Sequence, residues 1–553
     1  MGDGAKEPPG QPEVPESLAG TANSPDYASN RDAMLAAVAD LCALEDRTAA
    51  ASAQRNARFA ERGQTPPRER LARLLDPGAP YLPLHRMAGY LADTDDPEKT
   101  LPGATFIGGI GYVSGIRAMV VVDDSGIRAG ALAPYALQAM LSFLAIAQRQ
   151  KLPFIHLVES AGANLMDYRV EDWAHGGGVF AGLAKLSAAG IPTVAVLHGP
   201  ATAGGAYMPG LSDYVVGVRG MGMAALAGAA LVEAATGERA QDADLGGAEM
   251  HAQTSGLVEY LAEDDRHALE ITREVVARLA WGSHASDPDA GQSAATAIDY
   301  PEHLAGVVPA NIFAPFDARE IAKRVLDAPG FTDFKPDFGP GTVCLQARLM
   351  GYAVGVLANN TPIDPAGAAK ATQFLQACDQ AGTPVIFLHN TTGYMVGTAS
   401  EQAGMIKHGS KMIQAVANLR VPKIGFITGA SFGAGNYGMG GWAFDPDFLF
   451  SWATARSGVM GGAQAAGTMS SVARAAAARK GAPVDEARLL AQEAAICAHF
   501  DRQAHPFYTS GRVLDHGVID PRDTRAIAGF CLSICAEARV RSLNPSTYGV
   551  ARI

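Results

Sequence analysis

A glycine-rich stretch, SFGAGNYGMGG at residues 431–441, carries residue types that could do chemistry in different ways. Gly433, Gly435 and Gly438 have the G-x-G-x-x-G spacing with which a turn holds a dinucleotide pyrophosphate. The overlapping letters GASFG have the G-x-S-x-G spacing that presents a nucleophilic serine, here Ser431. A third chemistry uses only the backbone, whose amides at the start of a helix can stabilise a developing oxyanion.

The surrounding sequence disfavours the first two possibilities. A pyrophosphate turn needs an acidic residue about 20 positions further on to bind the ribose, yet no Asp or Glu lies between Asp447 and Asp485. A nucleophilic Ser431 needs a downstream Asp and then a His, and a plain hydroxyl that caps the next helix is the simpler role. The candidates with the right order are Asp485 or Asp501, followed by His505 or His516.

The elements that must position this stretch occur twice along the chain. In each half, three short β-branched runs alternate with alanine-rich helical stretches, which is typical of a layered α/β fold. The last runs, Pro192 to Gly199 and Pro422 to Gly429, align at a constant offset of 230 residues. The runs are MVVVDD (119–124), PFIHLVE (153–159) and PTVAVLHG (192–199), then AVGVLANN (353–360), PVIFLHN (384–390) and PKIGFITG (422–429).

The glycine-rich stretch itself has a twin, AGGAY at residues 203–207. At the same offset Gly205 aligns with Gly435, and Tyr207 aligns with Tyr437. The position of Ser431 corresponds to an alanine in the twin, so a shared role belongs to the backbone. Both stretches are predicted to form a strand, a tight turn and a helix, with amides that converge at the helix start.

The duplication indicates two large domains, as expected for 553 residues. We assign residues 1–28, rich in Pro, Gly and acidic residues, to a flexible tail, residues 29–300 to an N-terminal domain and residues 301–553 to a C-terminal domain. The boundary falls in a Pro, Asp, Ser and Ala-rich segment. From Asn30 to about Leu75 the pattern predicts helix, interrupted at Pro66-Pro67.

Composition excludes several classes of function. The net charge of −12 disfavours nucleic acid binding, which requires a basic face. Six cysteines without a C-x-x-C pair make a disulfide framework or zinc site improbable, and with no secretory signal the cytoplasm is the expected compartment. No apolar run approaches the ~20 residues of a membrane span.

Several motifs together resemble one family, the carboxyltransferase (β) subunits of biotin-dependent acyl-CoA carboxylases, above all the 3-methylcrotonyl-CoA and geranyl-CoA carboxylase branch. The resemblance runs from about Asn30 to Ile553. The motifs include PRERLARLLDPGAP (67–80), GIGYVSG (109–115), TAGGAYMPG (202–210), FDAREIAKRVLD (316–327), NTTGYMVG (390–397) and SGVMGGAQAA (457–466), the last downstream of the glycine-rich stretch.

The resemblance implies an α/β fold of two tandem crotonase-like domains and a reaction in which CO2 passes from carboxybiotin to an acyl-CoA. Two enolates form, one on biotin and one on the thioester, so two oxyanion holes are needed. The family pattern places the amides of Gly204 and Gly205 at the thioester enolate. The amides of Ala434 and Gly435 are placed at the biotin oxygen.

The resemblance also implies which residues bind the two ligands. The loop ESAGANL (159–165) resembles the crotonase loop that supplies one oxyanion donor. No metal is expected. The acyl-CoA side is assigned Ala161, Gly162, Arg128, Gly176, Ala203 and Tyr207, and the biotin side Thr392, Gly393, Phe432, Gly433 and Tyr437.

The chain departs from the family pattern at three places. Arg128-Ala129-Gly130 replaces a Lys-Gly-Gly that contacts CoA phosphates, so the positive charge is kept. Ala463 replaces a glutamate. The run Gly176 to Gly178 replaces Phe-Gly-Arg, which should open the acyl pocket for a group bulkier than 3-methylcrotonyl, such as geranyl, unless the glycines merely loosen a loop.

The chain lacks a Met-Lys-Met biotinylation site and an ATP-grasp glycine loop, so the resemblance implies a separate α subunit that carries biotin. It also implies a β6 hexamer within an α6β6 complex. Two other functions stay open. One is a biotin-independent crotonase-like hydrolase or isomerase, and the other is a non-catalytic scaffold that binds a biotin-bearing subunit.

Overall fold

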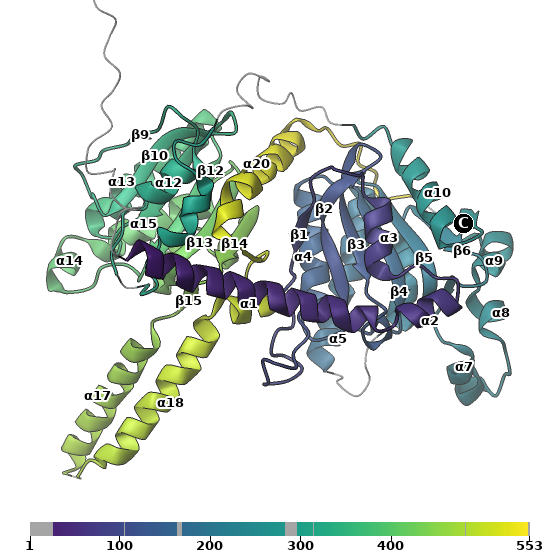
Figure 1. Cartoon of the computed structure of the whole chain (residues 1–553), viewed down its shortest axis with the longest axis horizontal. Coiled ribbons are helices and arrows are strands. Elements are labelled where there is room, and N and C mark those ends of the chain that lie inside the picture. The colour runs from purple at the N-terminus through teal and green to yellow at the C-terminus, as the bar shows by residue number, and fades with distance from the viewer. Residues whose placement is uncertain are drawn as a thin grey trace, which may run out of the picture.

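The computed structural model describes residues 26–103, 105–162, 169–282, 296–312, 314–481 and 483–550. In these residues the chain forms two eight-stranded sheets that lie side by side and are covered by helices (Figure 1). One sheet is built from residues 82–262 and the other from residues 332–519. The predicted tandem α/β architecture is therefore confirmed.

The first sheet has the order β1-β2-β3-β4-β5-β6-β8, with β7 paired to β5. The second has the order β9-β10-β11-β12-β13-β14-β16, with β15 paired to β13. The strand bounds are β1 Leu82–Leu84, β2 Phe106–Val113, β3 Ile116–Asp123, β4 Phe154–Ser160, β5 Thr193–Thr202, β6 Tyr214–Val218, β7 Met223–Ala225 and β8 Tyr260–Ala262; then β9 Thr332–Asp333, β10 Thr342–Leu349, β11 Tyr352–Asn359, β12 Val385–Thr391, β13 Lys423–Phe432, β14 Phe448–Trp452, β15 Arg456–Gly458 and β16 Val518–Ile519.

Each strand of the first sheet has a counterpart in the second. The first two pairings of each sheet are antiparallel and all later pairings are parallel. Even the register shift repeats, because Ser160 faces Ala201 in one sheet and Thr391 faces Ser431 in the other. In both halves this irregularity lies directly before the glycine turn, so the two turns begin at equivalent positions of their sheets.

Helices follow the strands and join the two halves. The longest, α1, runs across both sheets, and α20 lies between them (Figure 1). The helices longer than one or two turns are α1 Tyr27–Ala53, α3 Pro67–Leu74, α4 Ala136–Arg149, α5 Val170–Ala188, α7 Ala229–Thr236, α10 Asp265–Ala277, α12 Arg319–Val325, α13 Pro365–Ala381, α15 Met405–Ala417, α17 Gly462–Lys480, α18 Glu486–Ala504 and α20 Thr524–Val540. Short turns include α2 Asn56–Glu61, η3 Arg128–Gly130, η5 Ala203–Ala206, α6 Tyr207–Leu211, α8 Asp242–Gly246, α9 Ala248–Met250, η6 His251–Ser255, η7 Pro301–Gly306, α14 Thr398–Gln402, α16 Gly433–Gly438, η8 Trp442–Phe444, α19 Pro506–Gly511 and η9 Pro521–Asp523.

The N-terminal helical segment differs from its prediction in two details. Helix α1 begins at Tyr27, inside the segment assigned to a tail, of which residues 1–25 lie outside the described part. A break after Ala53 separates α1 from α2, and no proline or glycine marks it in the sequence. The predicted interruption at Pro66-Pro67 is present, and Pro67 opens α3 because a proline at the first helical position loses no hydrogen bond.

One apolar core spans both halves. It includes Phe143 of α4, Leu345 of β10 and Leu532 of α20, all at most 1% exposed. Such side chains each contribute roughly 1.5–3 kcal/mol when fully buried. Polar contacts reinforce the joint, as between Gln150 Nε2 and Asp447 Oδ1 at 2.7 Å. No helix in the described ranges has the length and apolarity needed to cross a bilayer.

Candidate active site: two matched glycine turns

The first glycine turn follows β5. Thr202 ends the strand, and Ala203 then takes a left-handed conformation with a φ of 53°. Gly204 and Gly205 follow in the 3₁₀ turn η5, which leads into α6. The first amides of a helix have no partner within it, so the amides of Gly204 and Gly205 are available to an anion or a polarised carbonyl.

The second glycine turn follows β13 and has the same backbone. Phe432 ends the strand with φ −115° and ψ 153°, against −111° and 158° for Thr202. Gly433 then has a φ of 55°, and Ala434 and Gly435 open α16. The predicted sequence of strand, tight turn and helix is confirmed in both halves.

The two turns differ in what surrounds them. A Cβ at Gly205 would meet none of the described atoms within 4 Å, whereas a Cβ at Gly435 would lie 2.9 Å from the Cα of Gly393. Gly204 and Ala434, the first amide-bearing residues of each pair, are both exposed. The N-terminal turn therefore faces open space, and the C-terminal turn is packed from behind while its outer edge is open.

A second loop approaches each turn from the neighbouring strand. After β4, the amide of Ala161 donates to Ala129 O at 3.1 Å and the amide of Gly162 donates to Ser160 Oγ at 3.1 Å. These two amides are thus engaged in this structure. The rest of the predicted oxyanion loop, residues 163–165, lies outside the described part of the chain.

The loop after β12 repeats this arrangement. The amide of Gly393 donates to Thr391 Oγ1 at 3.2 Å, as Gly162 does to Ser160. Gly393 has a φ of 132° and Gly162 a φ of 79°, values that favour glycine. Thr392 is exposed between its buried neighbours. Loop and turn are therefore brought together in each half, as the predicted sets of site residues require.

Arg128 lies in η3, close to the β4 loop. Its guanidinium pairs with Asp93 at 2.5 Å and is 42% exposed. Gly130 packs so closely that a Cβ there would lie 2.3 Å from Glu159 O, which is why this position needs glycine. The Arg128 charge is therefore retained beside the site, although it is partly neutralised by an acid that the sequence did not indicate.

Aromatic rings flank the N-terminal turn. Tyr207, 45% exposed, lies with its ring centroid 5.2 Å from that of Phe180 on α5. A Cβ at Gly204 would lie 3.7 Å from Phe180 Cζ, so Phe180 borders the turn. Gly176 lies four residues earlier on the same helix, hence on the same face. The three glycines at 176–178 are thus part of α5, not of a loop.

The C-terminal turn is bordered by apolar surface. Tyr437 is 47% exposed, like Tyr207. Phe432 is buried, and a Cβ at Gly433 would lie 3.3 Å from Val459 O. Val459 is 64% exposed. Ala463 is exposed in the first turn of α17, so the glutamate that it replaces would have faced solvent.

Ser431 is neither an accessible nucleophile nor a helix cap. It is fully buried in β13, where its Oγ lies 2.9 Å from His389 Nδ1 and accepts a hydrogen bond from Asn436 Nδ2 at 2.9 Å. Burial lowers the pKa of His389 to about 3, so the ring is neutral at physiological pH. The predicted capping role is wrong, because the hydroxyl is held by side chains of a neighbouring strand and of α16.

A buried charge network behind the N-terminal turn was not predicted. Arg70 of α3, 0% exposed, donates to Glu159 Oε2 at 2.6 Å and to Asp265 Oδ2 at 3.2 Å. His198 of β5 donates from Nδ1 to Asp265 Oδ1 at 2.6 Å. Glu159 is the penultimate residue of β4, just before the loop that follows this strand. The sequence showed only three Arg residues in PRERLARLL and no sign of their partners.

The charged and polar groups in this network shift each other's pKa values. Burial raises the pKa of Asp265, but the hydrogen bond from His198 and the charge of Arg70 outweigh it and leave that pKa below its usual value. Burial and the Arg70 charge lower the pKa of His198, so its ring is neutral and donates through Nδ1. The network thus ties α3, α10 and the ends of β4 and β5 together behind the site.

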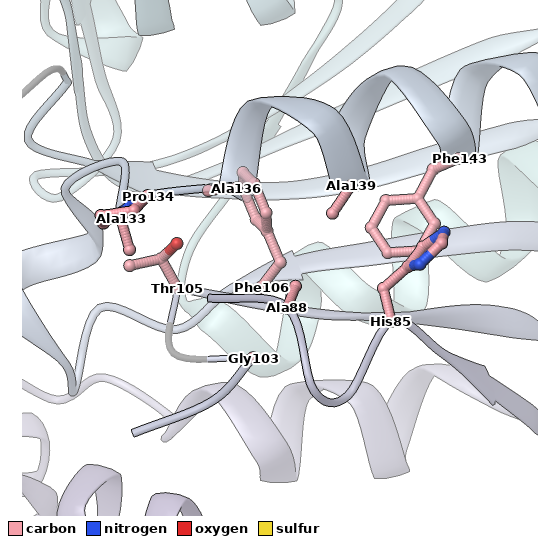
Figure 2. Close-up of a pocket in the computed structure, with 10 residues that line it drawn as sticks. All are labelled: His85, Ala88, Gly103, Thr105, Phe106, Ala133, Pro134, Ala136, Ala139 and Phe143. Atoms are coloured by element: carbon pink, nitrogen blue, oxygen red, sulfur yellow. The ribbon is translucent and has the colours of Figure 1, made fainter. Parts of the chain in front are cut away.

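A small cavity elsewhere does not belong to the two turns. Figure 2 shows it between α4 and the segment around β1 and β2, lined mostly by apolar side chains such as Phe106 and Phe143. His85, its largest polar residue, has Nε2 2.8 Å from Ser142 Oγ. In the described part of the chain no three His, Cys, Asp or Glu side chains gather as metal ligands would.

Comparison with known proteins agrees with this geometry. Residues 59–547 match the carboxyl transferase domain family. A probable biotin-dependent acyl-coenzyme A carboxylase β2 subunit from Mycobacterium tuberculosis is 46% identical, over 89% of this chain and 91% of its own length. The mitochondrial methylcrotonoyl-CoA carboxylase β chain of Arabidopsis thaliana is 38% identical, over 96% of this chain and 90% of its own.

A solved structure has the same fold throughout. The β subunit of geranyl-CoA carboxylase from P. aeruginosa superimposes with a TM-score of 0.89 at 46% identity, over 96% of this chain and 98% of its own. Fold and sequence both agree with the resemblance inferred from the motifs. The chain therefore belongs to the carboxyl transferase family, and its relatives include β subunits of biotin-dependent acyl-CoA carboxylases.

Proposed function

We propose that this chain is the carboxyltransferase subunit that moves CO2 from carboxybiotin, carried on a partner subunit, to an acyl-CoA. The observation that carries the proposal is the pair of matched turns, with φ values of 53° at Ala203 and 55° at Gly433. A reaction in which two carbonyl oxygens gain negative charge needs two sets of aimed amides. A duplicated turn supplies them without any side-chain base.

In the N-terminal half, the amides of Gly204 and Gly205 would bind the thioester oxygen. Because a Cβ at Gly205 would meet no described atom within 4 Å, there is room for a carbonyl to approach both amides. Fixed amide dipoles stabilise the negative charge that develops when the acyl group loses a proton. Removing one such donor in other enzymes costs about 100- to 1000-fold in kcat.

In the C-terminal half, the amides of Ala434 and Gly435 would hold the ureido oxygen of biotin. When bound, carboxybiotin supplies the CO2. The fit rests on the exposed Ala434 at the turn and on the uncharged Tyr437 and Val459 beside it, both largely exposed. A neutral ureido ring needs such an apolar border with a few amide donors. Thr392, Gly393, Phe432 and Gly433 would complete this side.

We further propose that the acyl-CoA substrate carries an acyl group bulkier than 3-methylcrotonyl, such as geranyl. The support is the face of α5 that borders the first turn, where Phe180 contacts Tyr207. One turn earlier on this face, a Cβ at Gly176 would meet no described atom within 4 Å. Gly178, in contrast, packs against α4, because a Cβ there would lie 3.0 Å from Leu141 Cδ2. Gly176 therefore leaves space where the substrate side lies, and Gly178 serves helix packing.

The assembly follows from the same proposal. Residues 29–300 and 301–553 would each supply one turn, so both halves serve one reaction. A separate α subunit would deliver biotin, in a complex built on six copies of this chain. Ala161, Gly162 and Arg128 lie on the acyl-CoA side, where the partly exposed Arg128 guanidinium remains close enough to solvent to meet a CoA phosphate.

The test is ATP-dependent incorporation of labelled bicarbonate. The native partner is isolated by pull-down with the full chain, and the complex receives geranyl-CoA, 3-methylcrotonyl-CoA and a short saturated acyl-CoA. We expect label in an acyl-CoA only when partner and ATP are both present, with geranyl-CoA preferred. Hydrolysis or isomerisation without a partner would instead indicate a crotonase-like enzyme, and no incorporation with a biotinylated partner would indicate a scaffold.

A further inference from the structure

Three polar side chains form a buried chain of hydrogen bonds behind the C-terminal turn. Asn436 of α16 donates from Nδ2 to Ser431 Oγ at 2.9 Å, and Ser431 Oγ lies 2.9 Å from His389 Nδ1. Ser431 and His389 are both fully buried. The three residues come from β12, β13 and α16, so the contacts link the glycine turn to the two strands beneath it.

The N-terminal half has no such chain at the corresponding positions. There Val158, Ala201 and Ala206 occupy the places of His389, Ser431 and Asn436. Val158 and Ala201 are fully buried in one small apolar cluster, against which Ala206 packs. At these three equivalent positions, therefore, one turn is backed by apolar side chains and the other by a polar chain.

The donors available fix the direction of the first hydrogen bond in this chain. The Asn436 amide is the donor to Ser431, whose hydroxyl proton can then be donated to His389 Nδ1. A neutral imidazole accepts at one nitrogen and carries the proton on the other. Burial keeps His389 neutral, so Nδ1 exchanges one hydrogen bond with Ser431 Oγ, and the tautomer of the ring sets its direction.

Asn436 is fixed from its other side as well. A Cβ at Gly441 would lie 1.9 Å from Asn436 Oδ1, and the Gly441 amide donates to Asn436 O at 2.9 Å. Asn436 directly follows Gly435, whose own Cβ position is closed by Gly393. These contacts fix the position of the first turn of α16 relative to the sheet. At the corresponding Gly205, a Cβ would meet no described atom within 4 Å.

We propose that Ser431 and His389 are positioning residues that hold the amides of Ala434 and Gly435 in place for a ureido carbonyl oxygen. The inference rests on the proposed function. It gives the polar chain a role only at the turn that binds biotin, not at the turn that binds the acyl-CoA. A ligand that is always the same cyclic urea suits a rigid turn that is hydrogen-bonded to the strands beneath it. Neither residue touches the reacting atoms.

The decisive variant is Ser431→Ala in the complete complex with its biotinylated partner. We expect kcat for bicarbonate incorporation to fall about tenfold or more, with the KM for acyl-CoA unchanged. We expect the same fall in the rate at which the carboxyl group passes from carboxylated acyl-CoA to free biotin. Thr372→Val, which removes a hydroxyl that donates to Ala368 O in α13, is the matched control and should leave both rates unchanged.

A second variant separates positioning from folding. The triple change His389→Val, Ser431→Ala and Asn436→Ala copies the residues at these positions in the N-terminal half, so the three polar side chains are removed together. We expect it to fold and still to show low kcat with normal KM for acyl-CoA. Wild-type kcat in Ser431→Ala or in the folded triple variant would overturn the inference, as would a loss that appears in the acyl-CoA KM. Failure of the wild-type complex to incorporate bicarbonate would instead overturn the proposed function.

Discussion

Ala203 and Gly433 lie at equivalent positions, 230 residues apart, and both have left-handed backbone, with φ values of 53° and 55°. The conformation is ordinary for glycine but costs an L-residue roughly 1–2 kcal/mol. The N-terminal turn therefore retains strain that the C-terminal turn avoids. Strain of this kind persists where the surrounding structure holds a turn in a shape that function requires.

Exchanging these two residue types should have opposite effects on stability. Gly433→Ala should lower the free energy of unfolding by about 1–2 kcal/mol, because the N-terminal turn already accommodates an alanine. Ala203→Gly should leave stability equal or raise it by less than about 1 kcal/mol, since relief of strain is offset by glycine entropy. Urea denaturation measures both. Global unfolding of Gly433→Ala would contradict the equivalence of the two turns.

A methyl group should affect the inner glycines of the turns differently. Gly205→Ala has space for its Cβ, so the protein should fold normally but lose carboxylation, because the methyl group occupies the approach of the thioester oxygen. Gly435→Ala forces a Cβ to 2.9 Å from the Gly393 backbone, so stability and activity should fall together. Thermal unfolding and bicarbonate incorporation, measured side by side, distinguish the two. Full activity of Gly205→Ala would remove the N-terminal turn from the mechanism.

The acyl-chain preference should depend on Gly176. Gly176→Phe places a ring beside Phe180 and Tyr207 and should lower kcat/KM for geranyl-CoA by about tenfold or more relative to 3-methylcrotonyl-CoA. Ala174→Phe is the control, because Ala174 is exposed and lies about 200° around α5 from Gly176. Competition between the two substrates measures the ratio. An unchanged ratio in Gly176→Phe would mean that the glycine run does not shape the pocket.

Arg70 should carry a large share of the stability of the first half. Arg70→Met leaves Glu159 and Asp265 buried without their cation, which costs about 3–5 kcal/mol when such a pair is broken. Arg73→Met on the same helix breaks an exposed pair with Glu69 and should cost less than about 0.5 kcal/mol. Guanidinium denaturation reports both values. Equal effects of the two changes would argue against a structural role for the network.

Asp515 should make stability depend on pH. Burial raises the pKa of this carboxyl to about 6, whereas an unfolded Asp has a pKa of about 3.9. The folded state thus binds the proton more tightly, so the contribution to folding is complete below about pH 4 and is lost as the pH rises through 6. A shift of this size corresponds to about 3 kcal/mol.

The isosteric change Asp515→Asn should remove this dependence. The variant should be more stable than the wild type above about pH 6, and the difference should vanish toward about pH 4. Urea denaturation of both proteins across this pH range measures the difference in the free energy of unfolding. In the wild type, Ser451 donates a hydrogen bond to Asp515 Oδ2 at 2.6 Å. The same difference at every pH would show that Asp515 does not titrate in this range.

The fold and the two glycine turns could be predicted because their signals are local in sequence. The strand runs, the glycines of the two turns and their constant offset are all readable from the printed chain, and they indicated the fold class and the duplication. The amides of Gly204, Gly205, Ala434 and Gly435 came from the resemblance to the family, and their role stays a prediction. A turn with positive φ and a close backbone approach restricts its own residue types, so such positions are marked wherever they occur. The break between α1 and α2 carried no such mark and was missed.

The tertiary structure alone decided which polar side chains support those turns. Arg70 meets Glu159 and Asp265, which lie 89 and 195 residues away along the chain, and Ser431 meets His389, 42 residues before it. The sequence motif suggested that Ser431 is a nucleophile or a helix cap. In the structure its side chain is buried against the neutral imidazole of His389 and links two strands. Partners of this kind are chosen by which elements pack together, and charge or hydroxyl groups carry no periodic pattern that would reveal them beforehand.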